Sequence, residues 1–232
     1  MLEYMKTGVL MIHGFSGGTY EIEPFANYIK ERTDWLVDMP TLPGHGEELS
    51  LKGYKASDWL MAAELAYRQL AKKVDEVIVV GFSMGGMIAL YLAKRYKIKK
   101  LVLLSAAAKY VSPSQLVRDL SVVADDAIHG LLQQNELFKR YAFKLKNVPF
   151  SATVEFMKIV RKVEPYISHI DLPVYIVQGE LDGIVPKVTA EYLFNEMAST
   201  EKHIHYSPSG KHHICYSDDC VQWFGDVYDF LR

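Results

Sequence analysis

Residues 81–86 read Gly81-Phe82-Ser83-Met84-Gly85-Gly86, and the rest of the chain is organised around them. The apolar, β-branched run at residues 77–80 predicts a buried strand before this turn. Residues 87–93 are good helix formers without proline and predict a helix after it. A Gly-x-Ser-x-Gly turn in this setting holds its serine in a strained conformation, and side chains at the glycine positions would collide with neighbouring backbone. We therefore expect the Ser83 hydroxyl to stand above the sheet, at the positive end of the following helix.

Short apolar runs alternate with helical patterns on either side of this turn. Strands are expected at residues 9–12, 35–39, 77–80, 101–104, 174–177 and 203–206. Helices are expected at residues 20–31, 57–73, 87–93, 189–197 and 220–231, with Ser57 as the N-cap of the second. This alternation predicts an α/β fold, with a mostly parallel sheet covered by helices on both faces. Ligands of such sheets bind at the carboxyl ends of the strands.

Residues 109–170 interrupt this rhythm because they contain no strand candidate. Ser112-Pro113 opens one helical stretch, residues 131–145 form a second, and Ser151 is expected to cap a third that reaches residue 163. We therefore expect residues 1–108 and 171–232 to form the core and residues 109–170 to form a small helical cap. The alternative is that these are ordinary helices covering the sheet.

An acid and a histidine follow the serine in the order that nucleophilic catalysis by serine requires. A serine nucleophile needs a base to take its proton and a carboxylate to orient that base. Asp182 lies in a Gly- and Pro-containing loop after a predicted strand, and His212 lies in a loop after the last one. Glu180 and His213 are the local alternatives.

These motifs resemble those of the bacterial carboxylesterase and monoacylglycerol lipase group of α/β-hydrolases. The resemblance extends over residues 9–231 and is weakest in the expected cap. Its motifs are His13-Gly14-Phe15, Gly44-His45-Gly46, residues 81–86, the Asp182 loop with Pro186, and the His212 region. It implies an α/β-hydrolase fold with the catalytic triad Ser83, Asp182 and His212. The family histidine usually follows Ser-Gly directly, whereas Lys211 here separates Gly210 from His212, which keeps His213 as an alternative.

An acyl-transfer site also needs two backbone N–H groups that stabilise the developing oxyanion. One is expected from Met84, the residue after the nucleophile. The resemblance implies that the other comes from Phe15. His45 is expected to support its loop rather than to take part in catalysis.

Composition limits the class of partner and compartment. The 26 basic and 28 acidic side chains leave a net charge of −2, which argues against a nucleic-acid partner. The first residues lack the pattern of a signal peptide, and no apolar run approaches the roughly 20 residues of a membrane span. Cys215 and Cys220 are expected to be reduced thiols. We therefore expect a soluble cytoplasmic protein without an integral membrane segment, as a monomer or homodimer.

The remaining histidines are candidate ligands for a metal ion. His203 and His205 would share one face of a strand, but no cysteine or carboxylate completes a zinc pattern around them. No metal and no cofactor are therefore expected.

The predicted function is that of a serine carboxylic-ester hydrolase acting on small-molecule esters with short- to medium-chain acyl groups, monoacylglycerols among the candidates. Thioesterase, acyltransferase or C–C bond hydrolase activity on the same triad is the first alternative, since a triad does not identify the leaving group. A non-catalytic ligand-binding domain on this fold is the second.

Overall fold

The computed structural model describes residues 5–108 and 148–232, and it contains one six-stranded sheet in the order β2-β1-β3-β4-β5-β6. Every adjacent pair of strands is parallel. The strands are β1 (Thr7–Ile12), β2 (Leu36–Asp38), β3 (Glu76–Phe82), β4 (Leu101–Leu104), β5 (Val174–Gly179) and β6 (Lys202–Ser207). Each overlaps a strand expected from the sequence, so the prediction of a parallel α/β sheet is confirmed.

The order of the strands creates a switch point between β1 and β3. The chain runs outward from β1 to β2, returns to place β3 on the other side of β1, and then continues in one direction to β6. Parallel sheets of this kind bind ligands outside the carboxyl ends of the strands where the order reverses. The segments that leave β1 and β3 begin at His13 and Ser83, so both expected motifs lie at this point.

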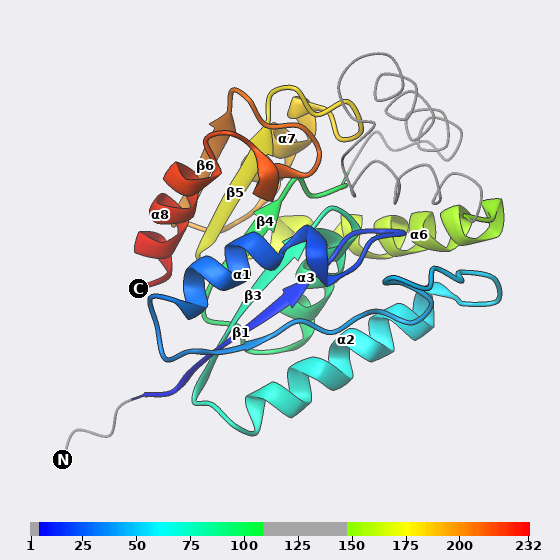
Figure 1. The fold of residues 1–232 in the computed structure, drawn as a ribbon, viewed down its shortest axis with the longest axis horizontal. Coiled ribbons are helices and arrows are strands. Elements are labelled where there is room, and N and C mark those ends of the chain that lie inside the picture. Colours follow the sequence, from blue (N-terminus) through cyan, green and yellow to red (C-terminus); the bar gives the residue numbers. More distant parts are fainter. Residues whose placement is uncertain (1–4, 109–147) are drawn as a thin grey trace.

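Helices cover both faces of the sheet (Figure 1). The α-helices are α1 (Glu23–Lys30), α2 (Ala56–Ala71), α3 (Met84–Arg95), α6 (Phe150–Val163), α7 (Lys187–Glu196) and α8 (Cys220–Leu231). The described residues also form three 3₁₀ turns, namely η1 (Thr19–Glu21), η2 (Glu164–His169) and η3 (Ile214–Tyr216). The helix expected at residues 20–31 is therefore divided, and Pro24 lies in the first turn of its α-helical part.

Two hydrophobic clusters lie on the two faces of the sheet, because successive residues of a strand point to opposite sides. Leu10 and Ile12 of β1 pack on the side of α2, α3, α6 and α7, whereas Val9 and Met11 pack on the side of α1 and α8. The four inner strands β1, β3, β4 and β5 are buried on both faces, which explains why their sequences are mostly apolar rather than alternating.

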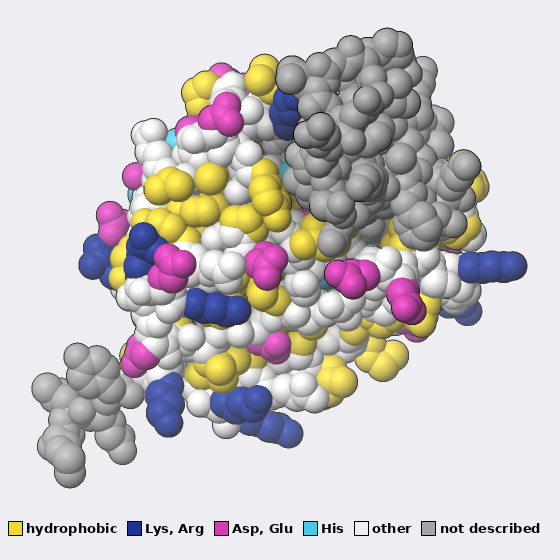
Figure 2. All heavy atoms as spheres, in the orientation of Figure 1, with side chains coloured by type: hydrophobic (Ala, Val, Ile, Leu, Met, Phe, Trp, Pro, Cys, Tyr) yellow, Lys and Arg dark blue, Asp and Glu magenta, His cyan; other side chains and the backbone are white. Residues whose placement is uncertain are grey.

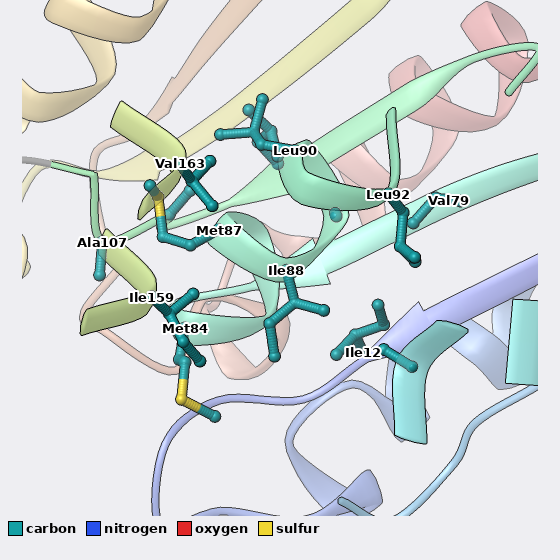
Figure 3. Close-up of a cluster of buried hydrophobic side chains, with 14 of the residues drawn as sticks. Ile12, Val79, Met84, Met87, Ile88, Leu90, Leu92, Ala107, Ile159 and Val163 are labelled. Carbon is teal, nitrogen blue, oxygen red and sulfur yellow. The ribbon is translucent and has the colours of Figure 1, made fainter. Parts of the chain in front are cut away.

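Residues 148–170 are the described part of the expected cap, and they pack on the core. Ile159 and Val163 of α6 lie in the same apolar cluster as Met84 and Met87 of α3 (Figure 3). The other two helices expected in the cap lie outside the described residues. Of the expected cap helices, the third is thus present, and it covers the helices on one face of the sheet.

Two expected helix caps are wrong. Helix α2 begins at Ala56 rather than after Ser57, because the Asp58 carboxylate accepts the Lys55 N–H at 2.8 Å and Glu155 accepts the Ala56 N–H at 3.0 Å. Helix α6 begins at Phe150, because Pro149 immediately before it holds an extended backbone. In the first case the cap comes from a residue 99 positions away, which local sequence cannot reveal.

Both cysteines are free thiols, as expected. Cys215 is buried, and burial raises the pKa of its thiol far above the ordinary value, so it remains protonated and unreactive. Within residues 5–108 and 148–232, no helix combines the length and the apolar composition needed to cross a membrane.

Candidate active site

Ser83 lies between β3 and α3 in a backbone conformation that side chains rarely adopt. Its φ is 52° and its ψ is −116°, and its backbone N–H donates to Leu104 O at 2.9 Å. The Ser83 carbonyl in turn accepts the Ala107 N–H at 3.2 Å. Positive φ at a non-glycine residue is strained, and it persists where the surrounding structure over-determines it. The sheet therefore holds Ser83 in the sharp turn expected from the sequence.

The glycines around Ser83 are required by close backbone contacts. A Cβ at Gly81 would lie 2.3 Å from Gly85 O, and one at Gly85 would lie 2.1 Å from Ile12 O. These distances are far below van der Waals contact, so no larger residue fits at either position. The second contact also presses the start of α3 against the end of β1, which brings Ser83 beside the loop that contains Phe15.

Asp182 lies in the loop after β5, and its carboxylate is held on both oxygens. Oδ1 accepts the N–H groups of Ile184 at 2.8 Å and Val185 at 2.9 Å, and Oδ2 accepts Gln178 Nε2 at 3.2 Å. Burial alone raises the pKa of Asp182, but the neighbouring His212 ring and the N–H groups of Val185 and Ile184 outweigh it, so the pKa lies below its ordinary value. Asp182 is therefore a fixed anion at neutral pH.

His212 bridges the serine and the aspartate. Its Nδ1 lies 2.9 Å from Asp182 Oδ2, and its Nε2 lies 3.1 Å from Ser83 Oγ. The loop that carries it is tied to the end of β5, because Leu181 N–H donates to Gly210 O at 2.9 Å. A carboxylate on Nδ1 leaves Nε2 as the nitrogen that can accept the serine proton, which is the arrangement that activates a serine nucleophile.

The two local alternatives have other partners. The Glu180 side chain is 40% exposed and pairs with Lys187 Nζ at 2.7 Å. His213 Nε2 lies 3.2 Å from Glu21 Oε1, and the His213 ring contacts Phe82. Neither residue therefore takes the place of Asp182 or His212 in the chain of hydrogen bonds.

Phe15 lies in the loop after β1, and Met84 directly follows Ser83. The Phe15 ring stacks on Phe156 of α6, with centroids 5.3 Å apart and planes 20° apart. It also meets the edge of Trp59 at 5.9 Å. Met84 is fully buried. Trp59, Met84 and Phe156 belong to one apolar cluster, so an apolar wall from α2, α3 and α6 includes the residue that follows Ser83.

The histidines near this wall hold loops in place. His13 Nε2 accepts the Leu42 N–H at 3.0 Å, and His45 Nδ1 lies 3.1 Å from Pro43 O. Trp59 Nε1 donates to the same Pro43 carbonyl at 2.9 Å. The loop containing Gly44-His45-Gly46 is therefore fastened to the loop after β1, in keeping with the supporting role expected for His45.

Sequence reasoning missed two polar residues that hold the site together. Gln178 donates to Asp182 Oδ2 and also to Val185 O at 3.0 Å, so it supports the acid loop. Asp219 accepts Ser207 Oγ at 2.5 Å and Ser209 Oγ at 3.0 Å, which closes the loop before His212. The only available signal was their position, since Gln178 ends an apolar strand run and the two serines flank Pro208.

His203 and His205 lie on β6 against α8, away from the triad. The His203 ring stacks on Tyr175 with centroids 5.5 Å apart, and His205 Nδ1 lies 3.9 Å from Asp226 Oδ2. In the part of the chain that the structure describes, no three His, Cys, Asp or Glu side chains are grouped so that they could hold a metal ion.

Residues 4–219 match the family described as serine aminopeptidase, S33. A thermostable monoacylglycerol lipase of Bacillus sp. (strain H-257) is 28% identical over 207 residues, covering 85% of this chain and 79% of the relative. A carboxylesterase of Bacillus subtilis (strain 168) is 23% identical over 228 residues, covering 97% of this chain and 92% of the relative. These similarities extend over nearly the whole chain.

Solved structures share the fold. A structure from the work on LipS and LipT, two metagenome-derived lipolytic enzymes, superposes with a TM-score of 0.78 at 22% identity, covering 98% of this chain and 94% of the other. The monoacylglycerol lipase of Paleococcus ferrophilus gives a TM-score of 0.74 at 18% identity, covering 97% and 93%. Because the family match extends over residues 4–219, which include the turn around Ser83 and the loop of His212, the chain belongs to the serine aminopeptidase S33 family and is a hydrolytic enzyme of the α/β-hydrolase fold.

Proposed function

We propose that this protein is a serine carboxylic-ester hydrolase, with Ser83 as nucleophile, His212 as general base and Asp182 as the residue that orients the histidine. The observation that carries the proposal is the continuous chain of contacts from Ser83 Oγ through the His212 ring to Asp182 Oδ2, with distances of 3.1 and 2.9 Å. A binding domain has no need of these three groups in this order, so the arrangement favours catalysis over ligand binding.

The reaction follows from this arrangement. Ser83 Oγ attacks the ester carbonyl carbon while its proton passes to His212 Nε2, and the carbonyl oxygen becomes an oxyanion beside the N–H groups of Phe15 and Met84. The intermediate collapses to an acyl-enzyme, and the alcohol leaves with the proton from His212. Water then attacks the acyl carbon while one of its protons passes to His212, and collapse of this second intermediate releases the acid as His212 returns the proton to Ser83 Oγ. Asp182 stays ionised throughout and stabilises the imidazolium.

An ester with a short- to medium-chain acyl group is the substrate that the surroundings of Ser83 favour. Phe15, Met84 and Phe156 are apolar and belong to one cluster that contains the residue after the nucleophile, and an alkyl chain packed against such side chains leaves water. The relatives named monoacylglycerol lipase and carboxylesterase support an ester as the class of substrate. The segment 109–170 is proposed as the cap that completes this acyl pocket.

Fluorophosphonate labelling combined with a substrate panel tests the proposal. Wild-type enzyme should be labelled at Ser83 and should hydrolyse p-nitrophenyl esters, whereas Ser83→Ala should be neither labelled nor active. Loss of the nucleophile from a serine hydrolase can cost about 10⁶ in kcat. Monoacylglycerols, acyl-CoA thioesters and an amino-acid anilide in the same panel separate ester hydrolysis from thioester and peptide-bond hydrolysis.

Circular dichroism and thermal unfolding of Ser83→Ala serve as the control for folding. More than a tenth of wild-type activity in a folded Ser83→Ala enzyme would refute the assignment of Ser83. A preference for the thioester or the anilide over every carboxylic ester would refute the substrate class while leaving the triad in place.

A further inference from the structure

Glu21 is a buried carboxylate that the proposed mechanism does not use. It ends η1, the residue is 2% exposed, and its carboxylate lies beside the loop that follows β1. Glutamate is almost never fully buried unless its charge is paired, because removing a carboxylate from water is costly. A carboxylate buried at this position therefore needs hydrogen-bond donors or a charged partner.

Those partners come from two loops of the proposed active site. Oε2 accepts the Gly14 N–H at 2.9 Å, and Oε1 lies 3.2 Å from His213 Nε2. The loop wraps closely around the carboxylate, since a Cβ at Gly17 would lie 1.9 Å from Glu21 Oε2. One side chain thus holds the loop of the proposed oxyanion donor on one oxygen and the loop of the proposed base on the other.

The bond to Gly14 bears directly on the oxyanion hole. Gly14 precedes Phe15, whose N–H is the proposed donor, and a glycine has wide conformational freedom unless a bond restrains it. Two residues later, Ser16 has a φ of 56°, which is strained for a residue with a side chain. Holding the Gly14 N–H fixes the peptide group that immediately precedes the one carrying the Phe15 N–H.

The bond to His213 bears on the base. His213 follows His212 directly, and Phe82 contacts both rings, with centroids 5.0 Å from His212 and 5.5 Å from His213. A further hydrogen bond joins the 3₁₀ turns that follow these two loops, because Tyr216 Oη of η3 donates to Tyr20 O of η1 at 2.6 Å. The backbone around His212 is therefore coupled to the backbone around Phe15 through Glu21 and its neighbours.

We infer that Glu21 is a positioning residue, and that it aligns the Phe15 N–H with the Ser83–His212 pair by binding Gly14 and His213 together. The inference rests on the proposed function, because it takes Phe15 as an oxyanion donor. It also gives His213 a role, as the residue that anchors this carboxylate rather than as the catalytic base.

The experiment compares turnover per active site in Glu21→Ala, Glu21→Gln, His213→Ala and His213→Gln enzymes. Active sites are counted by fluorophosphonate labelling, so that loss of folded protein is separated from loss of rate. Removing an oxyanion-hole donor costs about 10²–10³ in kcat, and misplacing one should cost less, so we expect Glu21→Ala to lose about 10- to 100-fold in kcat with little change in KM.

A transition-state analogue and two conservative variants provide readouts that a purely structural role would not move. The Ki of an alkylboronic acid, which forms a tetrahedral adduct on the serine, should rise in Glu21→Ala in parallel with the loss of kcat. Glu21→Gln should restore turnover, because its amide can still accept the Gly14 N–H and donate to His213. His213→Gln should likewise be more active than His213→Ala, because the glutamine amide can donate to Glu21.

Glu76→Ala is the matched control. Like Glu21, Glu76 joins two separate segments with its carboxylate, but it lies at the start of β3, where it accepts Thr7 Oγ1–H of β1 at 2.8 Å. This variant should keep wild-type turnover per labelled site. If Glu21→Ala gives no folded enzyme, the comparison of turnover in His213→Ala and His213→Gln tests the inference instead. Wild-type turnover and boronate affinity per site in Glu21→Ala, or in His213→Ala, would overturn the inference, as would an equal and complete loss in both His213 variants. Turnover by Ser83→Ala would instead remove the proposed function.

Discussion

At the residue scale, the site depends on a few polar groups whose states are set by their neighbours. Asp182 is the most enclosed of them, and four hydrogen-bond donors converge on its two oxygens. Replacing it by asparagine preserves its shape but removes the charge that orients His212 and stabilises its cation. In a serine protease, the same change of the triad aspartate to asparagine lowers kcat by about 10⁴.

We therefore expect Asp182→Asn to lose at least about 10³ in kcat, at substrate concentrations well above KM. Pre-steady-state measurements of p-nitrophenol release would show whether acylation is the step that slows. Glu180→Gln is the control, because Glu180 lies in the same loop and pairs with Lys187 instead. Activity within threefold of wild type in Asp182→Asn, or a large loss in Glu180→Gln, would indicate that Glu180 rather than Asp182 orients the histidine.

The lowered pKa of Asp182 also has a consequence for stability. Aspartate in an unfolded chain has a pKa of about 3.9. Because the folded-state pKa of Asp182 lies lower, its ionised form stabilises the native state above about pH 3.9, and this contribution is lost as the pH falls through the folded-state value. The difference in unfolding free energy between wild type and Asp182→Asn should therefore shrink as the pH is lowered below 4 or so. A difference that stays constant between about pH 6 and pH 3 would contradict this direction of shift.

At the element scale, β1, β3 and α3 meet so closely that only glycine fits between them. Gly85→Ala would place a methyl group 2.1 Å from Ile12 O and 2.6 Å from His13 O, and both of these are backbone atoms. We expect a loss of about 1–3 kcal/mol or more in unfolding free energy, together with loss of esterase activity, because α3 must move away from β1. Urea denaturation and labelling of Ser83 measure the two effects.

Gly225→Ala is the matched control, since Gly225 lies inside α8 and its added Cβ would be 3.5 Å from Tyr28 Oη. There the substitution should stabilise the helix by up to about 1 kcal/mol and leave activity unchanged. An equal effect of the two changes would mean that the packing of α3 on β1 is not what requires a glycine.

Helix α6 is the described part of the proposed cap that comes nearest to the site. Phe156 stacks on Phe15, so Phe156→Ala should open space at the proposed acyl pocket. We expect about 3–5 kcal/mol of destabilisation and a shift of the acyl-length optimum to longer chains, since each additional buried methylene is worth about 0.8 kcal/mol. The measurement is kcat/KM across p-nitrophenyl esters of increasing acyl length.

Val163→Ala separates pocket shape from general loosening. Val163 is also buried on α6, but it lies two turns further along, beside Met87 (Figure 3). It should lower stability without moving the optimum. An unchanged chain-length profile in Phe156→Ala, or the same shift in both variants, would show that α6 does not set acyl-chain specificity.

At the scale of the whole molecule, charge is balanced and dispersed. The net charge is −2, and Figure 2 shows basic and acidic side chains interspersed over the face that it displays. Charged surfaces of one sign accelerate the encounter with oppositely charged ligands, and salt suppresses that acceleration. For a neutral ester we therefore expect kcat/KM to change less than about twofold between roughly 0.05 and 0.5 M salt.

The same measurement with an acyl-CoA thioester is the comparison, because that substrate carries several negative charges. A steep fall of kcat/KM with salt for the neutral ester would contradict the expectation and would indicate electrostatic steering. A steep fall for the thioester alone, combined with a higher kcat/KM, would favour the thioesterase alternative.

Much of this architecture was determined by sequence alone, because its signals are local. Short, largely apolar runs predicted the strands, and the motif around Ser83 predicted a turn that only glycine neighbours permit. The chain order of Ser83, Asp182 and His212 selected three residues that the structure joins by contacts of 2.9 and 3.1 Å, since each follows the carboxyl end of a parallel strand. Parallel strands bring such ends to one edge of the sheet, so position along the chain was sufficient.

Only the tertiary structure decided which neighbouring group takes which partner. The sequence left His212 and His213 as alternatives, and in the structure His212 lies against Asp182 whereas His213 lies against Glu21, 192 positions away in the chain. The sequence likewise did not reveal that Glu155 accepts the Ala56 N–H at the start of α2, or that Gln178 donates a hydrogen bond to Asp182. Hydrogen bonds between distant segments depend on the geometry of the assembled sheet, and a buried carboxylate leaves no periodic or compositional signal in the sequence around it.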